Sequence, residues 1–118
     1  MLKKIECYIQ PFKLDALTQA LVQLGVDGMS VSEVKGFGRQ HGYLNGEADA
    51  SEIRKEDVKF RPKLKLEIVV SDRIVDRTVA LIIKLARTGN VGAGKIFVVP
   101  VEDAVRIGTG EVGHAAIV

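Results

Sequence analysis

The chain has 118 residues, of which 47% are apolar and 27% charged, values typical of one globular domain with a real core. Its net charge of +2, its 5% aromatic content and its lack of Trp argue against a basic or base-stacking surface for nucleic acids. No run of about 18 apolar residues is present, so no membrane-spanning helix is expected.

The first part of the chain reads as strand, helix, strand. Apolar and polar residues alternate over 2–9, which predicts a strand. Leucines then recur at helical spacing from Leu14 to Leu24, and Gly25 is a natural end for that helix. Residues 29–35 are rich in residues that favour strands and predict a second one.

The single cysteine, Cys7, cannot form a disulfide within the chain, which fits a reducing compartment. It alternates with Ile5 and Ile9, so we expect a buried strand residue rather than a functional thiol. The chain begins directly with strand-forming residues and not with the apolar stretch of a signal peptide. These features predict a cytoplasmic protein.

Residues 39–61 differ from the rest because they are polar and carry charges of both signs. Structureless loops beyond about 12–15 residues are uncommon and are usually functional or disordered. We therefore expect a flexible loop in the free protein, which a partner could order. Ser51 is a candidate modification site there, although a lone serine in a polar loop is more often simply polar.

The second part of the chain repeats the pattern of the first. Residues 63–70 alternate cleanly after Pro62 and predict a strand. Asp72 is expected to cap a helix over about 73–86. A last strand over 96–99 is expected to stop at Pro100. The predicted buried stripe of the second helix is Val75, Val79, Ile82, Ile83 and Ala86.

This order of elements predicts an α+β fold of the ferredoxin-like βαββαβ type in a single domain, 1–118. Two helices would cover one face of a four-stranded antiparallel sheet. The other face would carry a mixture of side chains that includes Lys3, Lys65, Glu67 and Val69. Because such a face suits partial burial by other copies of the chain, we expect a homo-oligomer.

The glycine-rich segment between the second helix and the last strand is the clearest sign of function. Gly89, Gly94 and Lys95 satisfy the spacing G-x-x-x-x-G-K, and such loops bind phosphates through backbone N–H groups and a lysine. However, Ile96 stands where a P-loop has Ser or Thr, and a P-loop leads from a strand into a helix. We therefore expect a phosphate-binding loop over 88–95 that is not a P-loop.

Five segments of the chain resemble the PII nitrogen-regulatory signal-transduction family. They are Pro-Phe-Lys-Leu-Asp (11–15), Val-Lys-Gly-Phe-Gly-Arg-Gln (34–40), Ala-Arg-Thr-Gly (86–89), Gly-Ala-Gly-Lys-Ile-Phe-Val (92–98) and Arg-Ile-Gly-Thr-Gly-Glu (106–111). The resemblance implies a homotrimer with ATP or ADP in three clefts between subunits. It also implies a loop, the T-loop, that contacts a target; here it spans 39–61.

The resemblance also implies the ligand-binding residues. The segment 92–95 would wrap the phosphates, and the tail, 106–118, would bring Arg106 to them from the neighbouring subunit. Gln40 and Lys63 would bind 2-oxoglutarate, with Gln40 also helping to hold Mg²⁺ beside ATP. The full nucleotide-binding set is Ser30, Gly36, Gly38, Arg39, Glu67, Val69, Gly92, Ala93, Gly94, Lys95, Arg106, Ile107 and Gly108.

Three departures from the family pattern bear on the ligand and the target. Gly108 stands in place of a second arginine, which predicts weaker discrimination in favour of ATP and a preference for ADP or AMP. Ala93 replaces a common Asp and so removes a negative charge near the phosphates. The T-loop is longer than usual and lacks the tyrosine that is uridylylated in the family; Glu52 or Glu56 falls at that position.

These features favour a nucleotide-sensing regulator of a membrane transporter or a metabolic enzyme, most often in nitrogen metabolism. The unusual loop leaves a bicarbonate or metal-ion transport system open as the target. Two competing functions are a slow ATPase and a structural trimer without a ligand. No nucleophile, base and oxyanion site is apparent, so no catalytic residue is assigned.

Overall fold

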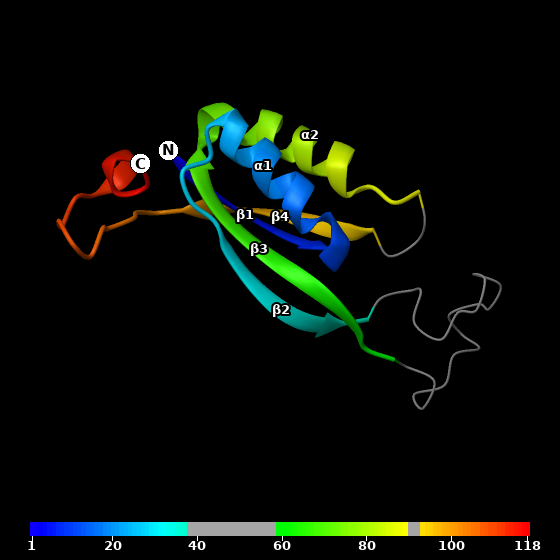
Figure 1. Cartoon of the computed structure of the whole chain (residues 1–118). Coiled ribbons are helices and arrows are strands. Elements are labelled where there is room, and N and C mark those ends of the chain that lie inside the picture. Colours follow the sequence, from blue (N-terminus) through cyan, green and yellow to red (C-terminus); the bar gives the residue numbers. More distant parts are fainter. Residues whose placement is uncertain (38–58, 90–92) are drawn as a thin grey trace.

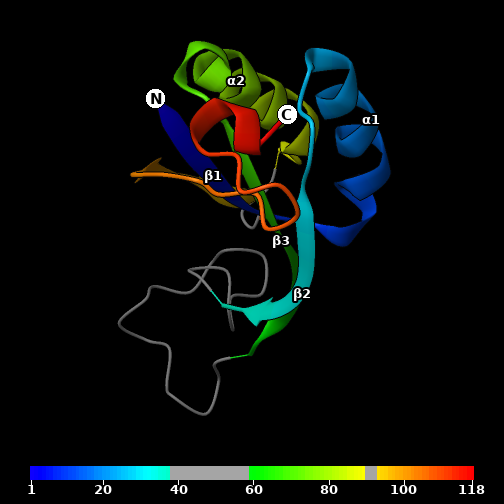
Figure 2. The same ribbon diagram turned by 90° about the vertical axis from the view of Figure 1, so that its left-hand side faces the viewer.

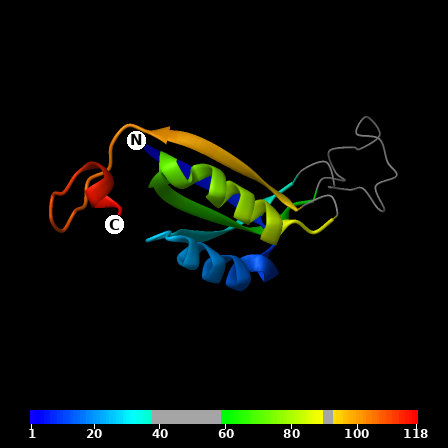
Figure 3. The ribbon, with the colours of Figure 1, turned by 90° about the horizontal axis from the view of Figure 1, so that it is seen from above.

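The computed structural model describes residues 1–37, 59–89 and 93–118 (Figure 1). The expected βαββαβ order is confirmed, and Figures 1 and 3 show both helices over the same face of the sheet. The elements are β1 (Leu2–Ile9), α1 (Leu14–Leu24), β2 (Ser30–Gly36), β3 (Arg61–Ser71), α2 (Val75–Ala86) and β4 (Gly94–Val101), with 3-10 turns at Pro11–Lys13, Asp72–Ile74 and Gly113–Ala116.

The four strands form one antiparallel sheet in the order β2-β3-β1-β4. Alternate residues of the two central strands point toward the helices, and Cys7 among them is fully buried as predicted. Burial of these apolar side chains between sheet and helices supplies the main stabilisation of the fold. The most deeply buried members are Ile5, Cys7, Ile9, Leu17, Leu21, Leu66, Ile68, Thr78 and Ile82.

The helix ends agree with the sequence at α1 but differ at α2. Gly25 ends α1 with a φ of 109°, a conformation that favours glycine. At α2 the expected cap was wrong, because the hydroxyl of Ser71 and not Asp72 accepts from the backbone, at 3.3 Å from Arg73 N. A 3-10 turn, Asp72–Ile74, follows Ser71, and α2 therefore begins only at Val75.

The buried stripe of α2 also differs from the prediction in one place. Ile83 is 41% exposed, whereas Thr78, a polar residue that hydrophobic periodicity does not place in the core, is fully buried. The Thr78 hydroxyl donates to the carbonyl oxygen of Ile74 at 2.7 Å, so this polar group is satisfied inside the core. The helix is thus turned so that Thr78, Ile82 and Ala86 face the sheet.

Two prolines that were expected to bound strands lie inside them. β3 begins at Arg61, the last residue of the span predicted for the T-loop, and Pro62 pairs with Lys35. At that point β3 has passed the end of β1, since Ile9 pairs with Leu64. Pro100 lies within β4, an edge strand, where a missing N–H group costs no interior hydrogen bond.

Candidate functional site

The ends of all four strands lie together at one side of the sheet. This side, where strands begin or finish, is called the edge and is distinct from the outer edge strands β2 and β4. β1 and β2 finish there, and β3 and β4 begin there, with Ile9 paired to both Leu64 and Gly94. Gly36 pairs with Arg61 at the same edge. Of the predicted ligand-binding residues, four are therefore brought to this one edge, namely Gly36, Lys63, Gly94 and Lys95.

The described part of the glycine loop packs directly against β1. Gly94 has a φ of 124°, and a Cβ atom built on it would lie 1.7 Å from the carbonyl oxygen of Tyr8. Only glycine fits this close approach of two backbones. Lys95 follows, paired with Tyr8, and its exposed side chain is available to an anion. Ala93 is described and partly buried.

Lys63 lies on β3 opposite Val34 and is 8% exposed. Loss of hydration and the nearby charge of Arg61 both lower the pKa of Lys63. A lysine cation at this place can form a charge-assisted hydrogen bond to an anionic ligand.

Ser30, Glu67 and Val69 lie on the sheet face away from the helices. Ser30 and Glu67 are directly paired across β2 and β3. The carboxylate of Glu67 contacts Lys4 Nζ at 3.4 Å and Lys65 Nζ at 3.5 Å. Glu67 is therefore already part of a charged network, in which Lys4 also contacts Glu6 at 2.9 Å.

The tail residues Arg106, Ile107 and Gly108 lie at the other end of the molecule. β4 runs away from the glycine loop and ends beside Leu2, and the tail continues from there. Figure 2 looks from that end and shows the tail in front of the strands. Ile107 is fully exposed. Within one chain, Arg106 and Lys95 are not brought together.

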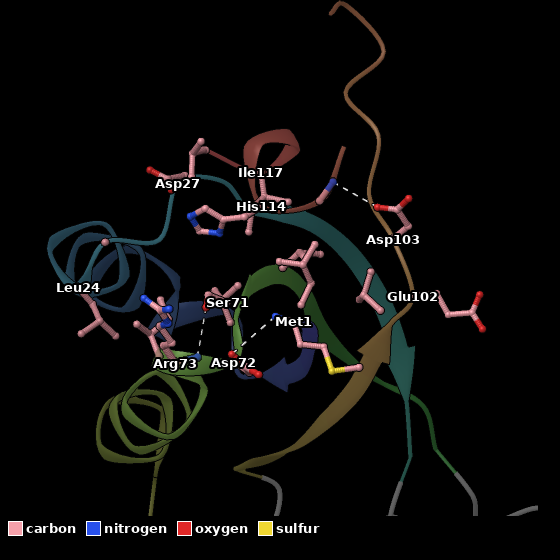
Figure 4. Close-up of a pocket in the computed structure, with 18 residues that line it drawn as sticks. Met1, Leu24, Asp27, Ser71, Asp72, Arg73, Glu102, Asp103, His114 and Ile117 are labelled. Carbon is pink, nitrogen blue, oxygen red and sulfur yellow. Dashed lines mark hydrogen bonds and ion pairs between the residues drawn. The ribbon is translucent and has the colours of Figure 1, made fainter. Parts of the chain in front are cut away.

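A large cavity lies at this tail end, with a volume of about 710 Å³. It is bounded by the N-terminus, the turn after α1, the start of α2 and the tail, and it includes Val69. Figure 4 shows His114 and Asp27 on one side of it, with Met1 and Asp72 joined by an ion pair of 3.9 Å. No sequence pattern points to this cavity, because its lining comes from segments far apart in the chain.

A smaller cavity of about 150 Å³ lies beside Ala93 and Gly94, between β1, β4 and the end of α2. Cys7 lines it, and burial raises the pKa of its thiol to about 11. A thiol with such a pKa is not the thiolate that nucleophilic chemistry requires at neutral pH. The side chain of Cys7 therefore contributes to the packing of the core.

Several predicted residues lie outside the described residues, namely Gly38, Arg39, Gln40, Ser51 and Gly92, together with Glu52, Glu56 and most of the T-loop. In the described ranges 1–37, 59–89 and 93–118, no three His, Cys, Asp or Glu side chains are grouped to hold a metal ion. None of the helices in these ranges has the length and apolar character needed to cross a membrane.

Comparison with known proteins gives matches over almost the whole chain. The family model described as "Nitrogen regulatory protein P-II" matches residues 2–111. "Nitrogen regulatory protein P-II 1" of Escherichia coli (strain K12) is 51% identical over 116 residues, 98% of this chain and 100% of that protein. "Nitrogen regulatory protein P-II" of Cereibacter sphaeroides is 48% identical with the same coverage.

A solved structure agrees with these matches. The crystal structure of Arabidopsis thaliana PII bound to citrate superposes with a TM-score of 0.76 and 37% sequence identity. The similarity covers 98% of this chain and 91% of that one.

Proposed function

The chain belongs to the nitrogen regulatory protein P-II family, and we propose that it reports the ATP and ADP state to a transporter or enzyme through its T-loop. Family membership makes it a signal-transduction protein of nitrogen regulation and not an enzyme. The slow ATPase considered from the sequence is therefore set aside. A cytoplasmic location agrees with this role and is part of the proposal.

The observation that carries the nucleotide proposal is the contact between Gly94 and Tyr8. A side chain at position 94 would collide with the Tyr8 carbonyl, so the loop can enter β4 only with a glycine there. Glycine-rich segments of this kind suit phosphate binding, and the exposed Lys95 adds a positive charge directly after Gly94. We propose that the segment 88–95 binds the phosphates.

The position of Arg106 supports a site shared between chains. Because Arg106 and Lys95 lie at opposite ends of one chain, both can reach one nucleotide only if they come from different copies. We propose a homotrimer in which the tail of one subunit completes the loop site of the next. Ser30, Glu67 and Val69 would line the adenine side of each cleft.

The second effector in the proposal is 2-oxoglutarate, bound with Mg²⁺ and ATP. Lys63 supports this assignment, because its cation, 8% exposed, lies on β3 opposite Val34 near the end of the sheet, where a positive charge suits an anionic effector. Gln40 would supply the other contacts to the effector and the metal. The T-loop begins and ends at this same edge, so ligand binding there can bias its conformation.

Calorimetric titration tests this function directly. ATP, ADP and AMP are each titrated into the full chain with Mg²⁺, with and without 2-oxoglutarate. Saturable nucleotide binding without turnover supports the sensor, and coupling between ATP and 2-oxoglutarate supports the effector assignment. If none of the three nucleotides binds, the sensor proposal is wrong.

A further inference from the structure

The guanidinium of Arg106 is already occupied by the chain's own tail. Its Nη2 atom donates a hydrogen bond to the carbonyl oxygen of Val118. Its Nε atom lies 3.9 Å from the carboxylate oxygen Oε1 of Glu111. The side chain to which the proposed function gives the phosphates is thus paired with a competing anion.

Backbone contacts fix Glu111 in this position. Arg106 N donates to the Glu111 carbonyl oxygen at 2.8 Å, and Gly110 N donates to the Arg106 carbonyl oxygen at 2.8 Å. A bridge between Val105 and Val112 closes the same turn. The backbone of Glu111 is therefore held on a closed hairpin next to Arg106.

Thr109 fixes the side chain of Glu111 as well. Its hydroxyl donates to Glu111 Oε1 at 2.8 Å and accepts from Glu111 N at 3.2 Å. The same oxygen, Oε1, is the one that faces Arg106. Thr109 thus orients the competing carboxylate.

We propose that Glu111 and its hairpin form an internal latch that holds Arg106 away from the nucleotide until a phosphate displaces the carboxylate. This inference rests on the proposed function, since it assumes that Arg106 is a phosphate ligand. Glu111 is in this view a positioning residue that sets nucleotide affinity without touching the nucleotide.

The contact between Arg106 and Glu111 is weak enough for a phosphate to replace it. Arg106 Nε is shielded from solvent and, among the described residues, has no acceptor within hydrogen-bond distance, because 3.9 Å from Glu111 is too long. A phosphate carries more charge than a carboxylate and can accept hydrogen bonds from the guanidinium at normal length. The ligand therefore offers Arg106 a better partner than the tail does.

The expected effect is modest because both side chains are partly exposed, at 40% and 51%. A pair of this kind, when it must break before binding, weakens the apparent affinity by about two- to fivefold. Removing the competing charge should raise the affinity by the same factor, and salt should reduce the gain.

The test compares Glu111→Gln with a matched control, Glu102→Gln. Both changes remove one negative charge from the region after β4, but Glu102, which lines the cavity shown in Figure 4, precedes the hairpin closed between Val105 and Val112. ADP and Mg-ATP are titrated into both variants and the unmodified full-length chain at low and high salt. The latch predicts tighter binding for Glu111→Gln alone, with the gain shrinking at high salt.

A second variant, Thr109→Val, tests the latch without the amide group that Glu111→Gln introduces. It removes the hydroxyl that orients Glu111 and is expected to raise the affinity in the same direction. Unchanged or weaker nucleotide binding by Glu111→Gln overturns the latch. A gain in Glu102→Gln equal to that in Glu111→Gln overturns it too, because the effect would then be general electrostatics.

Arg106→Ala separates failure of the latch from failure of the proposed function. If Arg106→Ala binds nucleotide as tightly as the unmodified chain, the assignment of Arg106 to phosphate is wrong. If Arg106→Ala loses binding while Glu111→Gln gains none, the function stands and only the latch is wrong. If the unmodified chain shows no binding, the appearance of binding in Glu111→Gln supports the latch, and its absence overturns it.

Discussion

Gly94 and the carbonyl oxygen of Tyr8 approach so closely that no side chain fits between them. A Cβ atom at position 94 would lie 1.7 Å from that oxygen and 2.9 Å from the carbonyl carbon. Both atoms belong to the backbone of Tyr8 in β1, which is paired with β4, so neither can move without disturbing the sheet. The glycine loop is therefore anchored to β1 by geometry.

Gly94→Ala should destabilise the protein by about 2 kcal/mol or more, because the φ of 124° and the backbone collision are both unfavourable for alanine. Gly89→Ala is the matched control. Gly89 also has a positive φ, 79°, but open space around it, so Gly89→Ala should cost only about 1 kcal/mol. Urea unfolding at one protein concentration measures both. Equal losses for the two variants would contradict the collision.

Gly108→Arg should increase the preference for ATP over ADP by about tenfold, because a second guanidinium near Arg106 would add hydrogen bonds to the distal phosphate. The structure admits the change, since a Cβ at Gly108 meets nothing within 4 Å and its φ is not positive. Calorimetry with each nucleotide gives the ratio of affinities. Gly108→Ala is the control and should leave the ratio unchanged; an unchanged ratio in Gly108→Arg contradicts the prediction.

Strong local patterns allowed most of the fold to be predicted from the sequence. The alternation in β1 and β3 and the leucine spacing in α1 each report which face is buried. The errors came where tertiary context decides. Pro100 looked like a strand end because local rules ignore that β4 is an edge strand, which tolerates proline.

The site could be predicted only in its local parts. The glycine loop is contiguous in sequence, so Gly94 and Lys95 were visible as a phosphate-binding pattern. The pairing of Arg106 with Glu111 depends on a hairpin that no simple periodicity reports. The large cavity near His114 is assembled from distant segments, and its existence follows only from how the tail folds back.

Thr78→Val should destabilise the protein by about 1 kcal/mol, because valine keeps the shape but loses the hydrogen bond to the carbonyl oxygen of Ile74. Thr78 is fully buried, so water cannot replace the lost donor. Thr78→Ser keeps the hydroxyl and loses only a methyl group, and its comparison with valine separates the hydrogen bond from packing. Urea unfolding gives both free energies. If Thr78→Val leaves the free energy of unfolding unchanged, this hydrogen bond does not stabilise the core.

The ion pairs of Lys4 with Glu6 and Glu67 lie on the sheet face away from the helices, and they should make the stability of the fold depend on pH in the acid range. Lys4 lies 2.9 Å from Glu6, and this hydrogen bond with its charge lowers the pKa of the Glu6 carboxyl below its usual value. A group with a lowered pKa in the folded state stabilises the fold above its unfolded pKa. That stabilisation is lost as the pH falls through the folded pKa.

Glu6→Gln should therefore lower the thermal midpoint near neutral pH and leave it nearly unchanged in strong acid, where Glu6 is protonated in both states. Lys4 behaves oppositely, because its partners raise its pKa, so its contribution fades as the pH rises through that raised value. Thermal unfolding from acid to alkaline pH, compared with the exposed control Glu33→Gln, measures the effect. A constant difference between Glu6→Gln and the unmodified chain at every pH would contradict a role for this ion pair.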